Sequence, residues 1–145
     1  RLLRQRLLSW ANFSMLYFQT MNMRTPENQA AYETFKQTYE GECVFCDMSE
    51  REPKQILETN ETMMIVENYF PYHIWDNFVV ADHRMIVPKR HLGSLDTFNE
   101  KERSDYFDLL RQYEAEHYSF YSRAPSNTSR TVYHLHTHLF KPIGY

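Results

Sequence analysis

Three histidines occupy alternate positions in one short stretch near the C-terminus: His134, His136 and His138. The flanking residues 131–133 and 139–140 are mainly β-branched, aromatic or apolar, so the stretch is predicted to be a strand. Alternate side chains of a strand share a face and lie roughly 7 Å apart. We therefore expect the three imidazoles to point the same way. Such a face suits proton transfer, attack on phosphorus or metal binding, whereas three buried filler histidines would each need hydrogen-bond partners.

The two cysteines of the chain, Cys43 and Cys46, form one C-x-x-C pair. This spacing closes too small a loop for a structural disulfide. It suits metal binding or redox chemistry in a reducing compartment, and we expect a cytoplasmic protein. Two free thiols are the alternative.

Length and composition favour one globular domain. The 145 residues are 42% hydrophobic and 16% aromatic, enough for a single sizeable core. The net charge of -3 gives no electrostatic case for a nucleic-acid partner. No apolar run approaches the roughly 20 residues of a membrane span. Residues 1–24 are rich in Arg and lack acidic residues. Such a start can be a transit peptide or a membrane-surface helix, but we expect an N-terminal extension of upstream or vector origin, followed by a single domain over 25–145.

The remaining pattern predicts an α+β fold. A short helix is expected to begin at Thr25-Pro26 and to end near Gly41. A long helix is expected from the Asn99–Glu102 capping box to Pro125. Strands are expected over 55–58, 63–66, 77–80 and 84–87, with a loop over 68–76. With the histidine strand, these elements predict an antiparallel sheet of about five strands.

Several segments, in order, resemble the histidine triad (HIT) superfamily of nucleotide hydrolases and transferases. The signature His-x-His-x-His followed by two apolar residues is matched in full by residues 134–140. The other matching segments are Glu42-Cys43-Val44-Phe45-Cys46, Asn68-Tyr69-Phe70-Pro71-Tyr72 and His83 through His91. The resemblance covers about residues 41–142 and implies a HIT-like fold.

Two features depart from the family pattern. The approach to the triad is usually glycine-rich, often with Gly-Gln-Ser, but here it is Ser129-Arg130-Thr131. Thr131 keeps a hydroxyl, whereas Arg130 replaces a Gln that contacts phosphate in the family. Residues 73–81 are longer than the usual link and could reshape the base or leaving-group pocket.

The resemblance implies a covalent mechanism. His136 would attack the α-phosphorus of a nucleotide and form a nucleotidyl-histidine intermediate. Its other ring nitrogen would bind a backbone carbonyl near the first triad position. His138 would contact the phosphate oxygens. The substrate classes would be dinucleoside polyphosphates or nucleoside phosphoramidates.

Further site residues follow from the same resemblance. Asn68 would bind ribose hydroxyls, and the candidate neutral donors to phosphate are Asn127, Ser129 and Thr131. For His83 we expect packing or hydrogen bonding behind the site rather than catalysis. Many triad proteins are homodimers, so a dimer is expected.

Some triad relatives hold a structural zinc ion. The corresponding residues here are Cys43, Cys46, His91 and His134. Two thiolates and two imidazoles suit tetrahedral Zn²⁺, and four protein ligands make a closed site.

Two other function classes stay open at this point. His134, His136 and His138 could bind a catalytic metal that activates water, although the outer two would lie roughly 13 Å apart on a strand. Alternatively, the protein could be a non-catalytic nucleotide-binding module with the zinc site as scaffold.

Overall fold

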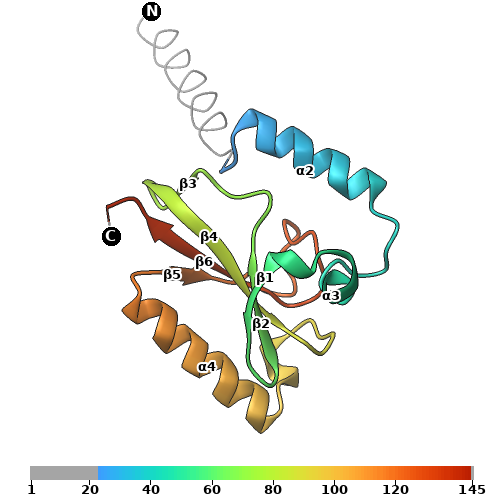
Figure 1. Cartoon of the computed structure of the whole chain (residues 1–145), viewed down its shortest axis with the longest axis vertical. Helices are drawn as coiled ribbons and strands as arrows, with labels where there is room; N and C mark the ends of the chain where they lie inside the picture. Colours follow the sequence, from blue (N-terminus) through green and yellow to red (C-terminus); the bar gives the residue numbers. More distant parts are fainter. Residues whose placement is uncertain (1–22, 145) are drawn as a thin grey trace, which may run out of the picture.

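The computed structural model describes residues 23–144 and contains one six-stranded antiparallel sheet (Figure 1). Its strand order is β1-β2-β4-β6-β5, and β3 pairs with one end of β4. The strands are β1 (Ile56–Thr59), β2 (Met63–Glu67), β3 (Ile74–Trp75), β4 (Phe78–Pro88), β5 (Ser119–Tyr121) and β6 (Thr137–Pro142). The helices are α2 (Pro26–Thr38), α3 (Met48–Arg51) and α4 (Glu100–Ala115), with short 3-10 turns at Pro53–Gln55 and Leu95–Thr97. The α+β class is confirmed.

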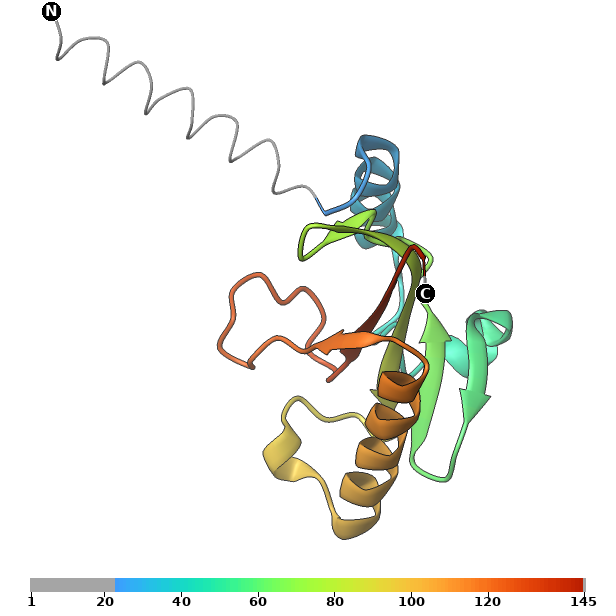
Figure 2. The ribbon, with the colours of Figure 1, turned by 90° about the vertical axis from the view of Figure 1, so that its left-hand side faces the viewer.

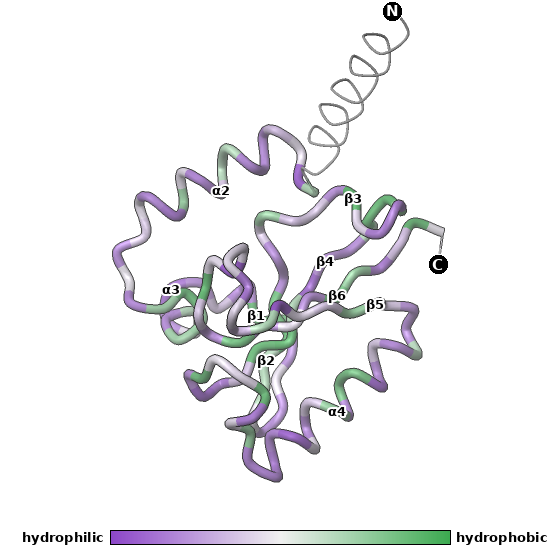
Figure 3. The backbone as a smooth tube through the Cα atoms, turned by 180° about the vertical axis from the view of Figure 1, so that it is seen from behind, coloured by the Kyte–Doolittle hydropathy of each residue, from purple (hydrophilic) through white to green (hydrophobic). Residues whose placement is uncertain are grey.

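The two faces of the sheet pack against different hydrophobic clusters. Along β2, Met63 and Ile65 pack in one hydrophobic cluster, while Met64 and Val66 pack in another. This alternation follows from the period of two in a strand. Because both faces are covered, these four residues are buried and β2 is strongly hydrophobic in Figure 3.

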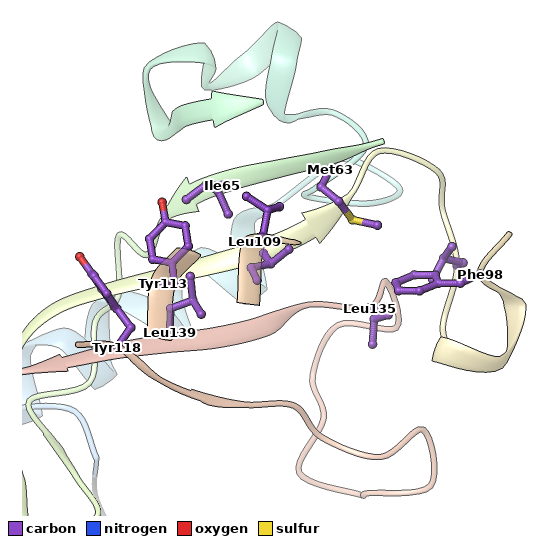
Figure 4. Close-up of a cluster of buried hydrophobic side chains, with 10 residues drawn as sticks. Met63, Ile65, Phe98, Leu109, Tyr113, Tyr118, Leu135 and Leu139 are labelled. Atoms are coloured by element: carbon purple, nitrogen blue, oxygen red, sulfur yellow. The ribbon is translucent and has the colours of Figure 1, made fainter. Parts of the chain in front are cut away.

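Helix α4 covers one face. Leu109 and Tyr113 lie among Ile65 and Leu139 of the sheet (Figure 4), and Figure 2 shows α4 running beside the strands. The Tyr113 hydroxyl donates to Glu58 Oε1 at 2.8 Å. The other face of the sheet is therefore left to the histidines and the residues around them.

The central pairing of β6 with β4 and β5 places the last triad histidine. His138 lies opposite Met85 of β4 and opposite Tyr121 of β5. Directly opposite residues of an antiparallel pair share a face. The three side chains therefore form one row across the sheet.

Several predicted boundaries are wrong. Strand β6 begins only at Thr137, so His134 and His136 precede it. The backbone N–H of Leu135 bonds to Leu92 O at 2.7 Å instead of joining the sheet ladder. The predicted single histidine strand is therefore an irregular segment that leads into a strand.

Two strands that were predicted separately form one continuous strand in the structure. Residues 77–80 and 84–87 belong to the continuous β4, because Asp82 in the polar interval is bound by Arg84 at 2.6 Å and by the Tyr118 hydroxyl at 2.5 Å. The predicted loop contains β3, which turns into β4 through Asp76 and Asn77 at φ 47° and 62°. Strand β5 was not predicted, and α4 ends at Ala115 rather than near Pro125.

The chain just before the predicted domain start contacts the fold. Met23 O accepts from His73 N at 2.6 Å, and Arg24 Nε donates to Phe70 O at 2.7 Å. The rest of the predicted extension, residues 1–22, lies outside the described residues. Within 23–144, none of the helices has the length and apolar character needed to cross a membrane.

The capping box of α4 gives a first test of the fold. Asn99 Oδ1 accepts from Glu102 N at 2.8 Å, and Glu102 Oε2 accepts from Asn99 N at 2.9 Å. Asn99→Ala is expected to lower the free energy of unfolding by about 1 kcal/mol, measured by urea unfolding. Ser104→Ala, an exposed change inside the same helix, is the control. Equal stability of Asn99→Ala and wild type would contradict the role of the cap.

Candidate active site and metal centre

A cavity of about 740 Å³ lies between α2 and the sheet face that carries the histidines. His136, His138 and Arg123 line one part of it, and apolar side chains, among them Phe45 and Met48, line another. Helix α2 has no fully buried residue and covers the cavity through side chains such as Tyr32. A mostly apolar cavity with a few converging polar groups is the usual form of a small-molecule site.

The His136 ring is held in one tautomer. Its Nδ1 donates to the carbonyl of His134 at 2.9 Å, so Nε2 carries no proton in the neutral ring. Burial, together with the nearby cations Arg130 and Arg123, lowers the pKa of His136 to about 4. At neutral pH the ring therefore has a free nitrogen lone pair. The structure contains the carbonyl contact that the family resemblance implies.

His138 is connected to a chain of hydrogen bonds behind it. The backbone N–H of Tyr72 donates to His83 Nδ1 at 3.0 Å, and His83 Nε2 lies 2.9 Å from His138 Nδ1. Desolvation lowers the pKa of His83 to about 3, so this ring carries one proton. Since the backbone N–H of Tyr72 occupies Nδ1, the proton is on Nε2 and is donated to His138.

Because His138 Nδ1 accepts the hydrogen bond from His83, the single proton of the neutral His138 ring is on Nε2. That nitrogen lies 3.2 Å from Arg123 Nη1, which can only donate. Burial also lowers the pKa of His138 well below its usual range. His138 Nε2–H and Arg123 Nη1 are thus two neighbouring donors, and one acceptor between them, such as a phosphate oxygen, could accept a hydrogen bond from each. His83 acts from behind the site, consistent with the prediction made for it.

Asn68 lies at the same corner of the cavity. Its Oδ1 accepts from Phe70 N at 2.9 Å, which orients the amide. Its Nδ2 lies 3.2 Å from His83 Nε2 and 3.9 Å from Met85 Sδ. The structure therefore places Asn68 at the cavity wall, and its predicted contact with ribose stays a prediction.

The three predicted donors of the approach loop differ in position. Thr131 and Ser129 line the cavity. The Thr131 hydroxyl lies 2.5 Å from that of Tyr32, while Ser129 Oγ accepts from Arg123 Nε at 3.0 Å. Asn127 is not among the residues that line this cavity. Its Oδ1 instead accepts from the backbone N and Oγ of Ser129, which caps the loop.

Arg130 holds the approach loop in place through hydrogen bonds to the backbone. Its guanidinium donates to the backbone carbonyls of Val132, Gly93 and Tyr133. A Cβ at Gly93 would lie 2.4 Å from the Tyr133 ring, so a side chain at this position would displace that exposed ring. Arg130 is not among the cavity-lining residues, so the residue that replaces the family's Gln fastens the loop instead of facing the cavity.

Cys43, Cys46, His91 and His134 form a cluster that can hold a metal ion. Their ligand atoms all lie within 4.8 Å of one another. The thiol of Cys43 lies 3.4 Å from His134 Nδ1, and that of Cys46 lies 3.3 Å from His91 Nδ1. Tetrahedral zinc bonds separate sulfur and nitrogen ligands by about 3.6 Å.

The hydrogen bond behind the cluster also fits a metal. His134 Nε2 donates to Pro88 O at 2.8 Å, so Nδ1 is left as the ligand atom. A ligand histidine that gives its other N–H to a carbonyl is the usual arrangement at metal sites. The four predicted ligands are therefore brought together with suitable donor atoms.

The triad histidines do not gather into a second group of candidate metal ligands among residues 23–144. Within residues 23–144, the Cys/His cluster is the one group of three or more candidate ligands close enough to share an ion. The Nδ1 atoms of His136 and His138 are bound to a carbonyl and to His83, respectively. The spacing of the ligand atoms, rather than these hydrogen bonds, disfavours a triad-bound catalytic metal.

Sequence analysis did not identify Arg123 and Arg24 as site residues. Arg123 follows β5, and its position depends on the pairing of Tyr121 with His138, which no local pattern indicates. Arg24 was assigned to the extension. Arg123 stands near a predicted donor loop, and that proximity was the available signal.

The low pKa of His83 gives a pH prediction. Between about pH 6.5 and pH 3 the unfolded chain binds a proton that native His83 does not bind, so stability falls as the pH falls. The slope is about 1.4 kcal/mol per pH unit for each such histidine. His83→Gln should reduce the slope by about this amount between pH 4 and 6 in urea unfolding, with exposed His73→Gln as control. Equal slopes for His83→Gln and wild type would contradict the assignment.

Comparisons with known proteins agree on the fold. No protein-family model matches the sequence, and no curated protein matches it significantly. Among solved structures, a HIT family hydrolase from Clostridium thermocellum is similar at 24% identity, over 74% of this chain and 95% of its own, with a TM-score of 0.54.

Two further solved structures have the same architecture. A HIT family member from Bacillus subtilis is similar at 16% identity, over 72% of this chain and 75% of its own, with a TM-score of 0.55. A histidine triad nucleotide-binding protein from Candida albicans is similar at 19% identity, over 69% of this chain and 75% of its own, with a TM-score of 0.51. The chain therefore has the fold of histidine triad proteins.

Proposed function

We propose that the protein is a nucleotidyl hydrolase or transferase that acts through His136. The observation that carries the proposal is the fixed tautomer of His136. Its Nδ1–H is bound to the His134 carbonyl, and its ring lines a cavity together with His138 and Arg123. The names of the solved relatives, a hydrolase and a nucleotide-binding protein, support the same class.

The reaction would proceed in two displacements. The Nε2 lone pair of His136 attacks the α-phosphorus of the nucleotide, a P–N bond forms, and the bond from phosphorus to the leaving group breaks with its electron pair. Water or another acceptor then attacks the same phosphorus, and the P–N bond breaks. The imidazole leaves as a neutral ring with its proton still on Nδ1, and the proton of the acceptor is released to solvent.

The surrounding residues would stabilise charge on the phosphate. His138 Nε2–H and the Arg123 guanidinium converge at 3.2 Å and both donate. Preorganised donors stabilise the charge that develops on phosphate oxygens in the transition state. The apolar wall that includes Phe45 and Met48 would hold the base.

The direct test is intact-protein mass spectrometry after rapid quenching. Wild type is mixed with adenosine and guanosine phosphoramidates and dinucleoside polyphosphates. We expect an adduct of one nucleoside monophosphate on wild type and on the control His73→Ala, and none on His136→Ala. The expected loss of turnover in His136→Ala is at least about 10³-fold, as for removal of a covalent nucleophile.

The same experiment distinguishes the proposed enzyme from a non-catalytic nucleotide-binding module. Tight nucleotide binding without adduct or product would support a non-catalytic binding module and contradict the proposal. Full turnover by His136→Ala would also contradict it. The homodimer and the cytoplasmic location stay predictions.

We further propose that the Cys/His cluster holds one structural Zn²⁺ ion. Four protein ligands would leave no open position for water, so the metal would supply rigidity rather than chemistry. The support is the distance set of Cys43, Cys46, His91 and His134 and the Pro88 carbonyl behind His134.

Removal of one ligand tests the zinc proposal. Cys43→Ser is expected to reduce bound zinc from about one per chain to near zero, measured by elemental mass spectrometry. The melting temperature should fall as well, because zinc binds the folded site more tightly than the unfolded chain. His73→Ala is again the control. Equal zinc content in Cys43→Ser and wild type would contradict the assignment.

A further inference from the structure

Two arginines outside the triad share one side of the cavity. Both Arg24 and Arg123 line it, and both contact Tyr72. The Arg24 guanidinium lies over the Tyr72 ring, 4.6 Å from its centroid. Arg123 Nη2 donates to the Tyr72 hydroxyl at 3.1 Å. One tyrosine thus carries a cation on its ring face and another at its hydroxyl.

Neither arginine belongs to an ion pair among the residues that the structure describes. Arg24 donates to two neutral acceptors, Phe70 O at 2.7 Å and Gln29 Oε1 at 3.4 Å. Arg123 likewise contacts neutral groups, among them Ser129 Oγ at 3.0 Å. Neither guanidinium therefore has a carboxylate within ion-pair distance among the described residues, although Arg24 is near enough to Glu33 to help lower the pKa of that carboxyl group.

The acidic residues that line the cavity do not pair with these arginines. Glu33 on α2 is bound by Lys36 at 2.8 Å and accepts from Gln29 at 2.8 Å. Glu52 lies between α3 and the 3-10 turn that precedes β1. Like charges that share a partly desolvated cavity oppose each other unless an anion lies between them.

The position of Arg24 is fixed by its neighbours. Its guanidinium lies between two aromatic rings, 4.2 Å from the centroid of Tyr32 and 4.6 Å from that of Tyr72. Stacking of this kind holds an arginine in place while its edge remains able to donate. Burial lowers the pKa of Arg24, which agrees with a guanidinium withdrawn from bulk water.

We propose that Arg24 and Arg123 form a binding site for a second anionic group of the substrate, adjacent to the phosphate that His136 attacks. The inference rests on the proposed function and narrows its substrate class. The protein would prefer nucleotides with two or more linked phosphates over phosphoramidates, whose leaving group is an amine. Arg123 would link the two positions, since it reaches both His138 and Tyr72.

The chemistry of the leaving group supports this choice. When the bond between the α-phosphorus and its bridging oxygen breaks, the departing phosphate takes the electron pair and gains negative charge. A guanidinium next to it stabilises that charge. An amine leaving group gains a proton and has no anion for Arg24 to bind.

Binding measurements without turnover test the inference. Dissociation constants of AMP, ADP, GMP and GDP are measured by calorimetry on the full chain carrying His136→Ala. The diphosphate is expected to bind about tenfold more tightly than the monophosphate, the effect of a hydrogen bond to a charged group. Arg24→Gln added to this protein should reduce the ratio to about two or less.

A matched control removes an arginine that lies away from the cavity. Arg111→Gln lies on α4, is not among the cavity-lining residues and is ion-paired with Asp108, so it should leave the ratio unchanged. Arg123→Gln is the second test variant and should lower both the ratio and the affinity for the monophosphate. It keeps the inference testable if Arg24→Gln does not fold, which a thermal melt would show.

The outcomes separate the inference from the proposed function. Monophosphate binding with no advantage for the diphosphate overturns the inference and leaves the function standing. An advantage that survives both arginine substitutions overturns the inference as well. If neither monophosphate binds, both the proposed function and the inference fail.

Discussion

The position of His134 is the constraint on which the site depends. Its ring contributes to the Cys43/Cys46/His91 cluster and donates to Pro88 O, while its own carbonyl accepts from His136 Nδ1. The backbone here is not part of the sheet, since β6 begins only at Thr137. The side-chain and backbone contacts of His134 therefore hold this segment in place, as hydrogen bonds to neighbouring strands would hold a segment inside the sheet.

The rest of the structure supports that segment from two sides. Arg130 clamps the approach loop to Gly93, and Leu135 N bonds to Leu92 O. Behind the triad, the sheet holds His138 against His83, and the Tyr72 backbone sets the direction of the proton chain. The cavity side thus presents an unprotonated nitrogen on His136 beside donors on His138 and Arg123. An arrangement of one nucleophile and several cationic or N–H donors is suited to an electrophilic phosphate and unsuited to a cation.

How far the sequence predicts this site depends on whether each residue is positioned locally. The C-x-x-C pair of the metal cluster is a short-range signal, whereas His91 and His134 are assigned as ligands from the family resemblance. The capping box of α4 could be predicted because it spans four residues. The strand over His134–His136 was wrong, because alternation of residue types does not reveal that His134 turns toward a cysteine cluster. Arg123 was missed because its place depends on β5 pairing with β6 across a loop. The predicted strands omit residues 81–83 because Arg84 and Tyr118, the partners of Asp82, cannot be recognised as such from the local pattern.

The central claim is that the fold presents His136 as a neutral ring with its proton on Nδ1. Long-range ¹⁵N–¹H correlation spectra of the histidine rings measure this directly, with His136→Ala used to assign the signal. The account predicts that at pH 7 the His136 ring shows a protonated Nδ1 and an unprotonated Nε2. A ring protonated on Nε2, or on both nitrogens, would contradict it, because no lone pair would then be available to attack phosphorus.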